Sequence, residues 1–416
     1  MTVAPTSKYA ITFVFITVLL DMVGFGLIIP VQPGLISQVA KVDVAHASMI
    51  GGGMFFAFSA AQFLMGPTLG NLSDAFGRRI MLLLAVFGLG LDYLITASAP
   101  SLGWLFVGRT LAGVCGSSYV IANAYIADIT PPEGRAKAFG MMGAAFGLGF
   151  VIGPAIGGLL GSFGPRVPFY VAACVSLANF IFGYFILPET LPPEKRRAFE
   201  GARANPVGTL KVFAQYKQVL PLCAVLGMYF FATSVYPAIW PFWSTAKFGW
   251  GPTLIGATLA AFGITMALSQ GLLTGPLVKR LGEWNLTLIG LGAGLVSCIA
   301  YGLAPNLMWV LIILLVHTPE GFVHPMLTAM MSREVPENAQ GELQGGLGSL
   351  MNIAMMAGTV FYSQAFGYFM QPTAIFVSSG ICFFIAAGLL LLTLLLLLMK
   401  SSRSAGTGPR FNPTPL

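Results

Sequence analysis

Long apolar segments separated by short polar turns make up most of the sequence. A membrane-spanning helix needs roughly 20 mostly apolar residues, and twelve segments of the chain meet that requirement. They lie near residues 9–36, 49–72, 80–99, 102–127, 138–163, 166–188, 216–246, 253–278, 284–304, 306–331, 343–370 and 373–399. The pattern predicts an all-α membrane protein with twelve transmembrane helices.

Composition and charge support this prediction. Of the 416 residues, 56% are hydrophobic and 8% are charged, whereas about a quarter of the residues of a soluble domain are charged. The net charge of +7 does not indicate nucleic-acid binding, because Lys and Arg accumulate on the side of a membrane protein that is not translocated. With a cytoplasmic N-terminus, 17 of the 21 basic residues lie on that side. We therefore expect a bacterial inner-membrane protein with both termini in the cytoplasm.

A polar segment divides the chain into two halves. The predicted parts are an N-terminal six-helix bundle, a cytoplasmic linker, a C-terminal six-helix bundle and a disordered cytoplasmic tail, at residues 1–188, 189–215, 216–399 and 400–416.

The halves also resemble each other in sequence. Gly70, Leu72 and Gly77 recur 205 residues later as Gly275, Leu277 and Gly282. Two parallel repeats of six helices are one way in which transporters form a central cavity with alternating access, so the repeat favours transport over catalysis.

The turn after the second apolar segment carries a charged motif. Its characteristic residues are Gly70, Asp74, Gly77, Arg78 and Arg79. Gly77 permits a tight reversal, and Asp74 is able to face the positive N-terminus of a neighbouring helix. A charged turn placed only by the distribution of basic residues explains the arginines but not the aspartate. The motif resembles the signature loop of the major facilitator superfamily, which implies a gating role for it.

The fifth apolar segment carries a glycine-rich motif that resembles the one characteristic of antiporters in that superfamily. Its residues are Gly140, Gly149, Gly153, Pro154, Gly157 and Gly158. Glycines four residues apart lie on one helical face and let another helix approach closely, and a proline kinks a helix. Close packing alone accounts for the glycines; the resemblance adds a seal against leak.

The resemblance narrows to the tetracycline-efflux branch of drug and proton antiporters. It rests on Asp21–Pro33, Arg78–Tyr93, Ile126–Asp128, Phe146–Gly149, Phe248–Trp250 and Leu343–Gly345. It implies coupling roles for Asp21, Asp92 and Arg109. The second half departs from the branch, because its histidine on helix 8 aligns with Met266 and its aspartate on helix 9 aligns with Gly294.

Charged side chains inside the bilayer are costly and usually mark a pathway. Asp21 and Asp92 each lie 12 residues into their helices, which is roughly 18 Å at 1.5 Å per residue. Arg109 enters from the opposite side to a similar height, so it is able to pair with an aspartate. Apolar surroundings disfavour an ionised carboxylate and a cation favours it, so such a group is able to load and release a proton. A permanent structural ion pair is the alternative.

The tenth segment holds His317, Glu320 and His324, spaced i, i+3 and i+7 on one expected helical face. Pro319 and Gly321 flank the glutamate and should loosen the helix. The spacing is not that of a zinc metalloprotease, and no metal or cofactor is predicted. A proton relay is the preferred interpretation; the alternative is a histidine that lowers the cost of burying the carboxylate.

Candidate substrate contacts come from aromatic and polar residues inside the apolar segments. They are Gln62, Asn123, Tyr229, Trp240, Phe242, Gln270 and Asn352. The aromatic residues are equally explained by an interfacial belt and by a pocket wall.

The sequence thus predicts a secondary transporter, active as a monomer, that exports an amphipathic, tetracycline-like organic molecule in exchange for protons. The alternatives are a proton-coupled importer, an exporter of metabolites or siderophores, and, more remotely, a membrane enzyme or receptor with a metal at helix 10.

Overall fold

The computed structural model describes residues 8–116, 118–201, 205, 208, 210–336 and 339–405, and within them it contains helices and no strand. The chain forms two compact units. The first comprises the described residues of Met1–Gly208, Tyr236–Ala267 and Thr359–Ser379. The second comprises those of Thr209–Val235, Leu268–Gly358 and Gly380–Leu416. The division into two six-helix halves and a linker stays a prediction.

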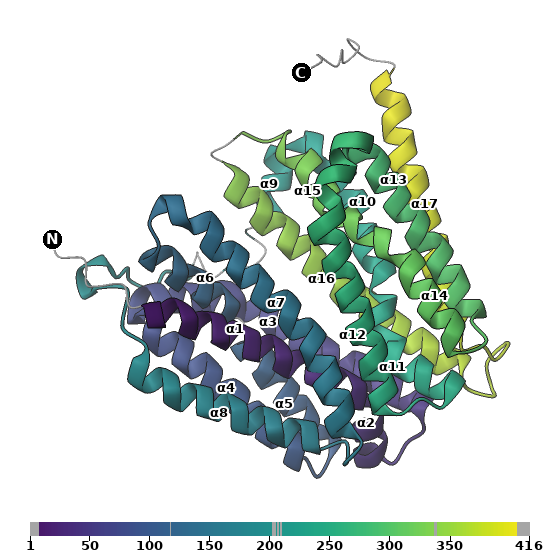
Figure 1. Cartoon of the computed structure of the whole chain (residues 1–416), viewed down its shortest axis with the longest axis horizontal. Coiled ribbons are helices and arrows are strands. Elements are labelled where there is room, and N and C mark those ends of the chain that lie inside the picture. Colours follow the sequence, from purple (N-terminus) through teal and green to yellow (C-terminus); the bar gives the residue numbers. More distant parts are fainter. Residues whose placement is uncertain are drawn as a thin grey trace. The chain divides into compact units, whose positions relative to one another are not determined.

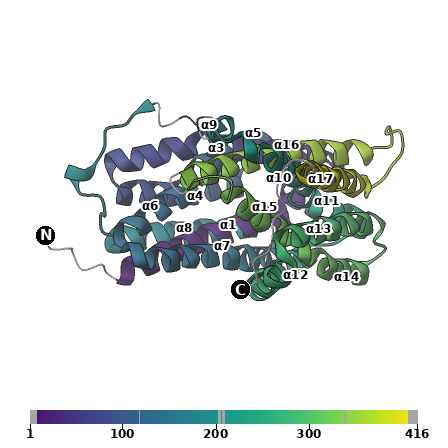
Figure 2. The same cartoon turned by 90° about the horizontal axis from the view of Figure 1, so that it is seen from above.

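The described residues up to Ile186 contain eight α-helices. They are α1 (Lys8–Ile28), α2 (Gln32–Ala40), α3 (Val44–Phe76), α4 (Arg78–Ser98), α5 (Leu102–Cys115), α6 (Ser118–Ile129), α7 (Pro132–Gly161) and α8 (Val167–Ile186). Helix α1 packs along α7, and α4 packs along α8 (Figures 1 and 2). A buried apolar cluster with members on α1, α4, α6 and α7 joins these helices, including Phe13, Leu82, Tyr125 and Met142.

The described residues from Lys211 to Ala405 contain nine α-helices and several tight turns. The helices are α9 (Lys211–Gln215), α10 (Leu220–Thr233), α11 (Val235–Phe248), α12 (Pro252–Leu268), α13 (Thr274–Leu303), α14 (Leu307–His317), α15 (Val323–Ser332), α16 (Gln340–Phe369) and α17 (Ile381–Ala405). A π-helical turn, η6 (Ser269–Leu273), precedes α13, and a 3₁₀ turn, η7 (Thr318–Phe322), joins α14 to α15. In the second unit α13 packs against α17 and η7, and α10 packs against α17.

The described helices confirm the all-α membrane fold. Ten segments are long and apolar enough to cross a membrane. One of them, Pro252–Leu303, is 52 residues long and contains two of the predicted spans. It bends at Gly282, whose φ of 75° is not helical. The bend divides this segment into two, so the ten segments contain eleven of the twelve predicted helices. The remaining one, predicted near residues 343–370, corresponds to the 30-residue α16, which is not among the ten.

The start of the last helix was predicted wrongly. We expected it near residue 373, but α17 begins at Ile381. Residues 370–380 form turns that contain Pro372 and Gly380, and Ile375 is 86% exposed. The apolar run Ile375–Val377 extended the hydrophobic pattern past the true helix start. Helix α17 also continues to Ala405, into the predicted tail, whose residues 406–416 lie outside the described part.

Candidate functional site

Asp92 and Arg109 form an ion pair in the first unit. Arg109 on α5 donates from Nη2 to Asp92 Oδ2 on α4 at 2.7 Å, and both side chains are buried. Thr96, one turn after Asp92, donates to Asp92 Oδ1 at 3.1 Å. Gly108 leaves the room for this contact, because a Cβ there would lie 2.5 Å from Thr96 Oγ1 and 2.8 Å from Asp92 Oδ1. The pairing that the sequence made geometrically possible is therefore present.

Asp21 is buried beside a neutral partner. Ser118, at the start of α6, donates to Asp21 Oδ2 at 2.7 Å, and Asp21 Oδ1 has no hydrogen-bond partner among the described residues. The Tyr93 ring, which follows Asp92 on α4, reaches α1 and lies against Gly24, one turn after Asp21. The Tyr93 hydroxyl thus lies close to the turn of α1 that follows Asp21.

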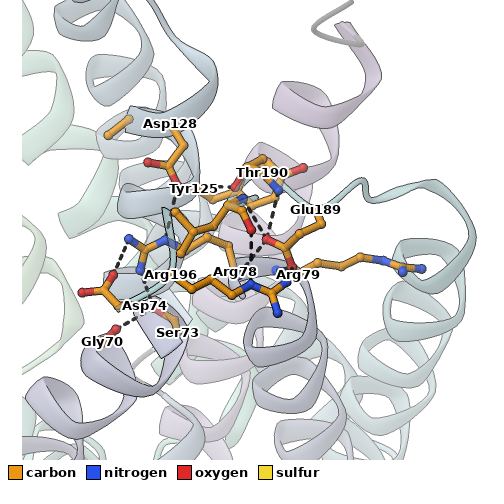
Figure 3. A network of polar contacts seen from close by, with 12 residues as sticks. Gly70, Ser73, Asp74, Arg78, Arg79, Tyr125, Asp128, Glu189, Thr190 and Arg196 are labelled. Carbon is orange, nitrogen blue, oxygen red and sulfur yellow. Dashed lines mark hydrogen bonds and ion pairs between the residues drawn. The ribbon is translucent and has the colours of Figure 1, made fainter. Parts of the chain in front are cut away.

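Arg78 is the centre of a polar network at the end of α3 (Figure 3). Its guanidinium contacts Asp74 Oδ1 at 2.5 Å, Ser73 Oγ at 2.5 Å and Asp128 Oδ2 at 3.3 Å. Gly77 makes the reversal between α3 and α4 with a φ of 106°, a backbone conformation that favours glycine. One arginine therefore holds the ends of α3 and α6 together.

The Glu189 side chain lies at the N-terminus of α4. Its carboxylate accepts hydrogen bonds from the backbone N–H groups of Arg78 and Arg79 at 2.9 Å and 3.2 Å. A carboxylate at this place satisfies free N–H groups and faces the positive end of the helix dipole. We expected the Asp74 carboxylate to face the N-terminus of a neighbouring helix. In this structure it pairs with the Arg78 side chain, and Glu189 accepts the hydrogen bonds from the N-terminus of α4 (Figure 3).

Glu320 is the centre of a buried polar cluster in the second unit. It lies in η7 with 2% of its surface exposed. His317 Nε2 lies 2.9 Å from Glu320 Oε2, and the Tyr229 hydroxyl on α10 donates to Glu320 Oε1 at 3.5 Å. Tyr301 on α13 contacts His317 Nδ1 through its hydroxyl at 3.3 Å. An acid, an imidazole and two phenols thus meet in an apolar region.

The 3₁₀ turn explains why the three helix-10 residues do not act as one face. The residues flanking Glu320, Pro319 and Gly321, were expected to loosen the helix, and the turn Thr318–Phe322 confirms this. Such a turn has 3.0 residues per turn rather than 3.6, which rotates later residues out of register. His317 contacts Glu320, whereas the His324 ring packs against Phe230 with centroids 5.4 Å apart.

A metal at helix 10 would need more ligands than this turn supplies. His317 and Glu320 are two groups, and zinc sites have at least three protein ligands. The described residues contain no set of three His, Cys, Asp or Glu side chains arranged to hold a metal ion.

The second unit contains a loop related to the Arg78 network but with reversed charges. At the repeat distance of 205 residues, Asp74, Arg78 and Asp128 correspond to Lys279, Glu283 and Arg333. Arg333 forms an ion pair with Glu283, just after the bend at Gly282, as Arg78 does with Asp128 after Gly77. The complementarity of the pair is preserved while each sign is inverted.

The glycine motif of α7 packs in two directions. A Cβ on Gly153 would lie 2.7 Å from Val23 O, and one on Gly157 would lie 2.7 Å from Leu27 Cα, both on α1. Gly149 contacts α1 in the same way, and Gly158 lies against Pro252. A Cβ on Gly140 would meet no atom within 4 Å. The expected close helix contact is therefore formed by the later glycines of the motif.

Two of the candidate substrate contacts lie at the Glu320 turn. Tyr229 donates to Glu320, and Gln270 donates from Nε2 to Gly321 O at 3.1 Å. The aromatic candidates are buried in side-chain packing, where Trp240 donates to Thr258 Oγ1 at 3.2 Å and Phe242 lies against Gly51. Elsewhere Gln62 donates to Gly116 O at 3.2 Å, Asn123 is half-buried and Asn352 is exposed.

These features define a multi-pass membrane transporter, and the comparisons with known proteins agree. The sequence profile of the Major Facilitator Superfamily matches residues 14–359. A class C tetracycline resistance protein of Escherichia coli is 38% identical over 359 residues, which cover 85% of this chain and 88% of the relative. A class G tetracycline resistance protein of Vibrio anguillarum is 36% identical, covering 84% and 89%.

The solved structure of the nucleoside transporter NupG shares the fold, with a TM-score of 0.75 at 16% identity over 94% of this chain and 98% of that one. The chain belongs to the Major Facilitator Superfamily. It is a transporter and not an enzyme.

Several residues of these sites were not found from the sequence. Ser118, Thr96 and Tyr301 are single hydroxyl residues in apolar helices, and nothing in the local pattern separates them from packing residues. Asp128 and Glu189 could have been found from the sequence. Both are acidic residues next to the cytoplasmic ends of predicted helices, on the same side of the membrane as Arg78 and Arg79.

Proposed function

We propose that the chain is a proton-coupled antiporter that exports an amphipathic, tetracycline-like organic molecule across the bacterial inner membrane. Both termini lie in the cytoplasm, and the monomer is the active form. The relatives named as tetracycline resistance proteins support the substrate class, and the distribution of Lys and Arg supports the orientation.

The buried Glu320–His317 contact carries the proposal for coupling in the second half. The carboxylate binds a proton while the site is open to the outside and releases it while the site is open to the cytoplasm, and substrate moves the opposite way. A guanidinium stays charged in proteins, whereas the imidazole is the type of side chain that exchanges protons near neutral pH. Glu320 is paired with a side chain of this second type, because its carboxylate lies 2.9 Å from His317 Nε2.

In the first half, Asp21, Asp92 and Arg109 form the proposed coupling group. Asp92 must separate from Arg109 to take up a proton, because the guanidinium stays charged and favours the carboxylate. Asp21 has only the hydroxyl of Ser118 as a hydrogen-bond partner among the described residues, so it needs no such separation.

The test is Glu320→Gln in everted vesicles with a pH-sensitive dye. Gln resembles the protonated acid in shape and polarity but does not release a proton. We expect energised accumulation of a tetracycline to fall to background while substrate binding or passive exchange stays measurable. Asp21→Asn should impair coupling as well. Accumulation by Glu320→Gln at the wild-type rate would assign coupling to the first half alone.

A further inference from the structure

The Glu320 carboxylate packs against Gly294 of α13, a position without a side chain. A Cβ built on Gly294 of α13 would lie 2.9 Å from Glu320 Cδ and 3.1 Å from Glu320 Cγ. Cβ atoms do not approach other heavy atoms as closely as the first of these distances. Any side chain at position 294 would therefore begin where the carboxylate now lies.

A second glycine receives the backbone of the same turn. A Cβ on Gly290, one helical turn before Gly294, would lie 2.9 Å from Pro319 O and 2.7 Å from Val323 Cγ2. Residues four apart share one face of a helix. Because both glycines lack side chains, this face of α13 allows η7 to pack closely against the helix backbone.

A third residue on the same face of α13, Tyr301, contacts His317. Tyr301 lies seven residues, or about two turns, after Gly294, and its hydroxyl contacts His317 Nδ1 at 3.3 Å. The other imidazole nitrogen, Nε2, is the one near Glu320 Oε2. One helix face therefore leaves space for the acid at Gly294 and orients its partner at Tyr301.

Resting on the proposed coupling role of Glu320, we propose that Gly294 is a positioning residue and that the place of the carboxylate, not the helix that supplies it, determines coupling. An Asp at position 294 would put its carboxylate carbon about 1.5 Å beyond its Cβ, in the space that the Glu320 carboxylate fills. The acid is then supplied by α13 instead of η7, beside the same His317.

The test is a reciprocal exchange measured as energised accumulation in everted vesicles. Glu320→Ala alone should fall to background. Gly294→Asp alone should also be impaired, because two carboxylates then compete for one space. The double variant, Gly294→Asp with Glu320→Ala, should accumulate roughly tenfold more substrate than Glu320→Ala alone. Such non-additivity is expected of two residues in contact.

Gly294→Ala supplies a measurement that does not require the acid to move. It keeps Glu320 but displaces its carboxylate from His317, so the pH at which transport is half-maximal should shift. Gly292→Ala is the matched control on the same helix, because a Cβ there meets no atom within 4 Å.

The outcomes separate the two proposals. Wild-type accumulation by Glu320→Ala would reject the coupling role itself. If Glu320→Ala is inactive but the folded double variant stays at background, or if Gly294→Ala keeps the wild-type pH profile, the positioning role of Gly294 is wrong while the role of Glu320 stands.

Discussion

The two units surround their buried acids with different partners. Asp92 in the first unit faces the guanidinium of Arg109, whereas Glu320 in the second faces the imidazole of His317. A guanidinium stays charged in proteins, while the imidazole is the type of side chain that exchanges protons near neutral pH. Both contacts are short and almost fully buried. Ion-pair geometry alone therefore does not identify a proton site, because the chemistry of the partner also determines the free-energy cost of protonating the acid.

The loops at the helix ends contain the same kind of ion pair in both halves, but the positive and negative residues exchange places. The Arg78–Asp128 pair of one loop corresponds to the Glu283–Arg333 pair of the other. Each follows a glycine with positive φ that reverses or bends the chain. The loop therefore needs complementary charges across the helix ends, and either helix is able to supply either sign.

The largest expected difference between the two acid sites concerns folding. Asp92→Asn leaves Arg109 buried without its counter-charge, and breaking a buried ion pair in this way costs about 3–5 kcal/mol. Glu320→Gln leaves an imidazole beside an amide, and an imidazole, unlike a guanidinium, is not obliged to carry a charge. We expect a much lower yield of monodisperse protein and a lower thermal midpoint for Asp92→Asn, and values near wild type for Glu320→Gln. Equal stability of the two variants would remove the distinction between an acid paired with arginine and an acid paired with histidine.

Glycines also serve the two units differently, which predicts a second large effect. In α7 they admit the backbone of α1, whereas in α13 Gly294 admits a side chain. Gly153→Leu should block transport or make vesicles leak protons, since Val23 and Gly26 leave no room for a branched side chain.

Gly147→Leu is the matched control for the α7 contact, because position 147 is exposed on the same helix and a Cβ there meets no atom within 4 Å. Tight, coupled vesicles containing Gly153→Leu would show that the α1–α7 contact does not act as a seal.

The sequence predicted the helices and the charged motifs well, because twelve apolar runs and a fixed loop spacing are local signals. It did not predict which groups meet. Ser118 and Asp21 are 97 residues apart, and Tyr229 and Glu320 are 91 apart. The departure at Gly294 became interpretable only when the structure placed the Glu320 carboxylate in the empty space. The expected i, i+7 spacing of His317 and His324 assumed a continuous α-helix, but the 3₁₀ turn Thr318–Phe322 lies between them.

A moderate effect is expected from Asp74→Asn in the loop network. The change removes one of the charges around Arg78, but Ser73 and Asp128 still contact the guanidinium. Transport should therefore slow while the yield of folded protein stays near wild type. The corresponding test of the second loop is Glu283→Arg, which should slow transport, combined with Arg333→Glu, which should restore it. Unchanged rates in reconstituted vesicles for Asp74→Asn would show that the loop does not control the transport cycle.

The smallest effect belongs to Asp43, a carboxylate outside the membrane spans that serves as a reference for the buried acids. Its Oδ1 caps α3 by accepting a hydrogen bond from the His46 backbone N–H at 2.8 Å. That bond, with a further one from the His46 ring, lowers the pKa of Asp43 below its usual value. The capped form is therefore favoured above the unfolded-state pKa of about 3.9 and is lost as the pH falls through the lower folded-state pKa.

Asp43→Ala should thus lower stability by about 1 kcal/mol at neutral pH, the usual cost of losing an N-cap. Thermal unfolding in detergent should show the difference from wild type narrowing below about pH 4, where the carboxylate becomes protonated in both states. Asp43→Asn keeps a cap acceptor and should stay near wild type at neutral pH. Transport should be unaffected in both variants, because a solvated carboxylate bound to backbone N–H groups takes no part in moving a proton through the bilayer. Loss of coupling in Asp43→Asn would mean that burial is not what distinguishes the coupling acids.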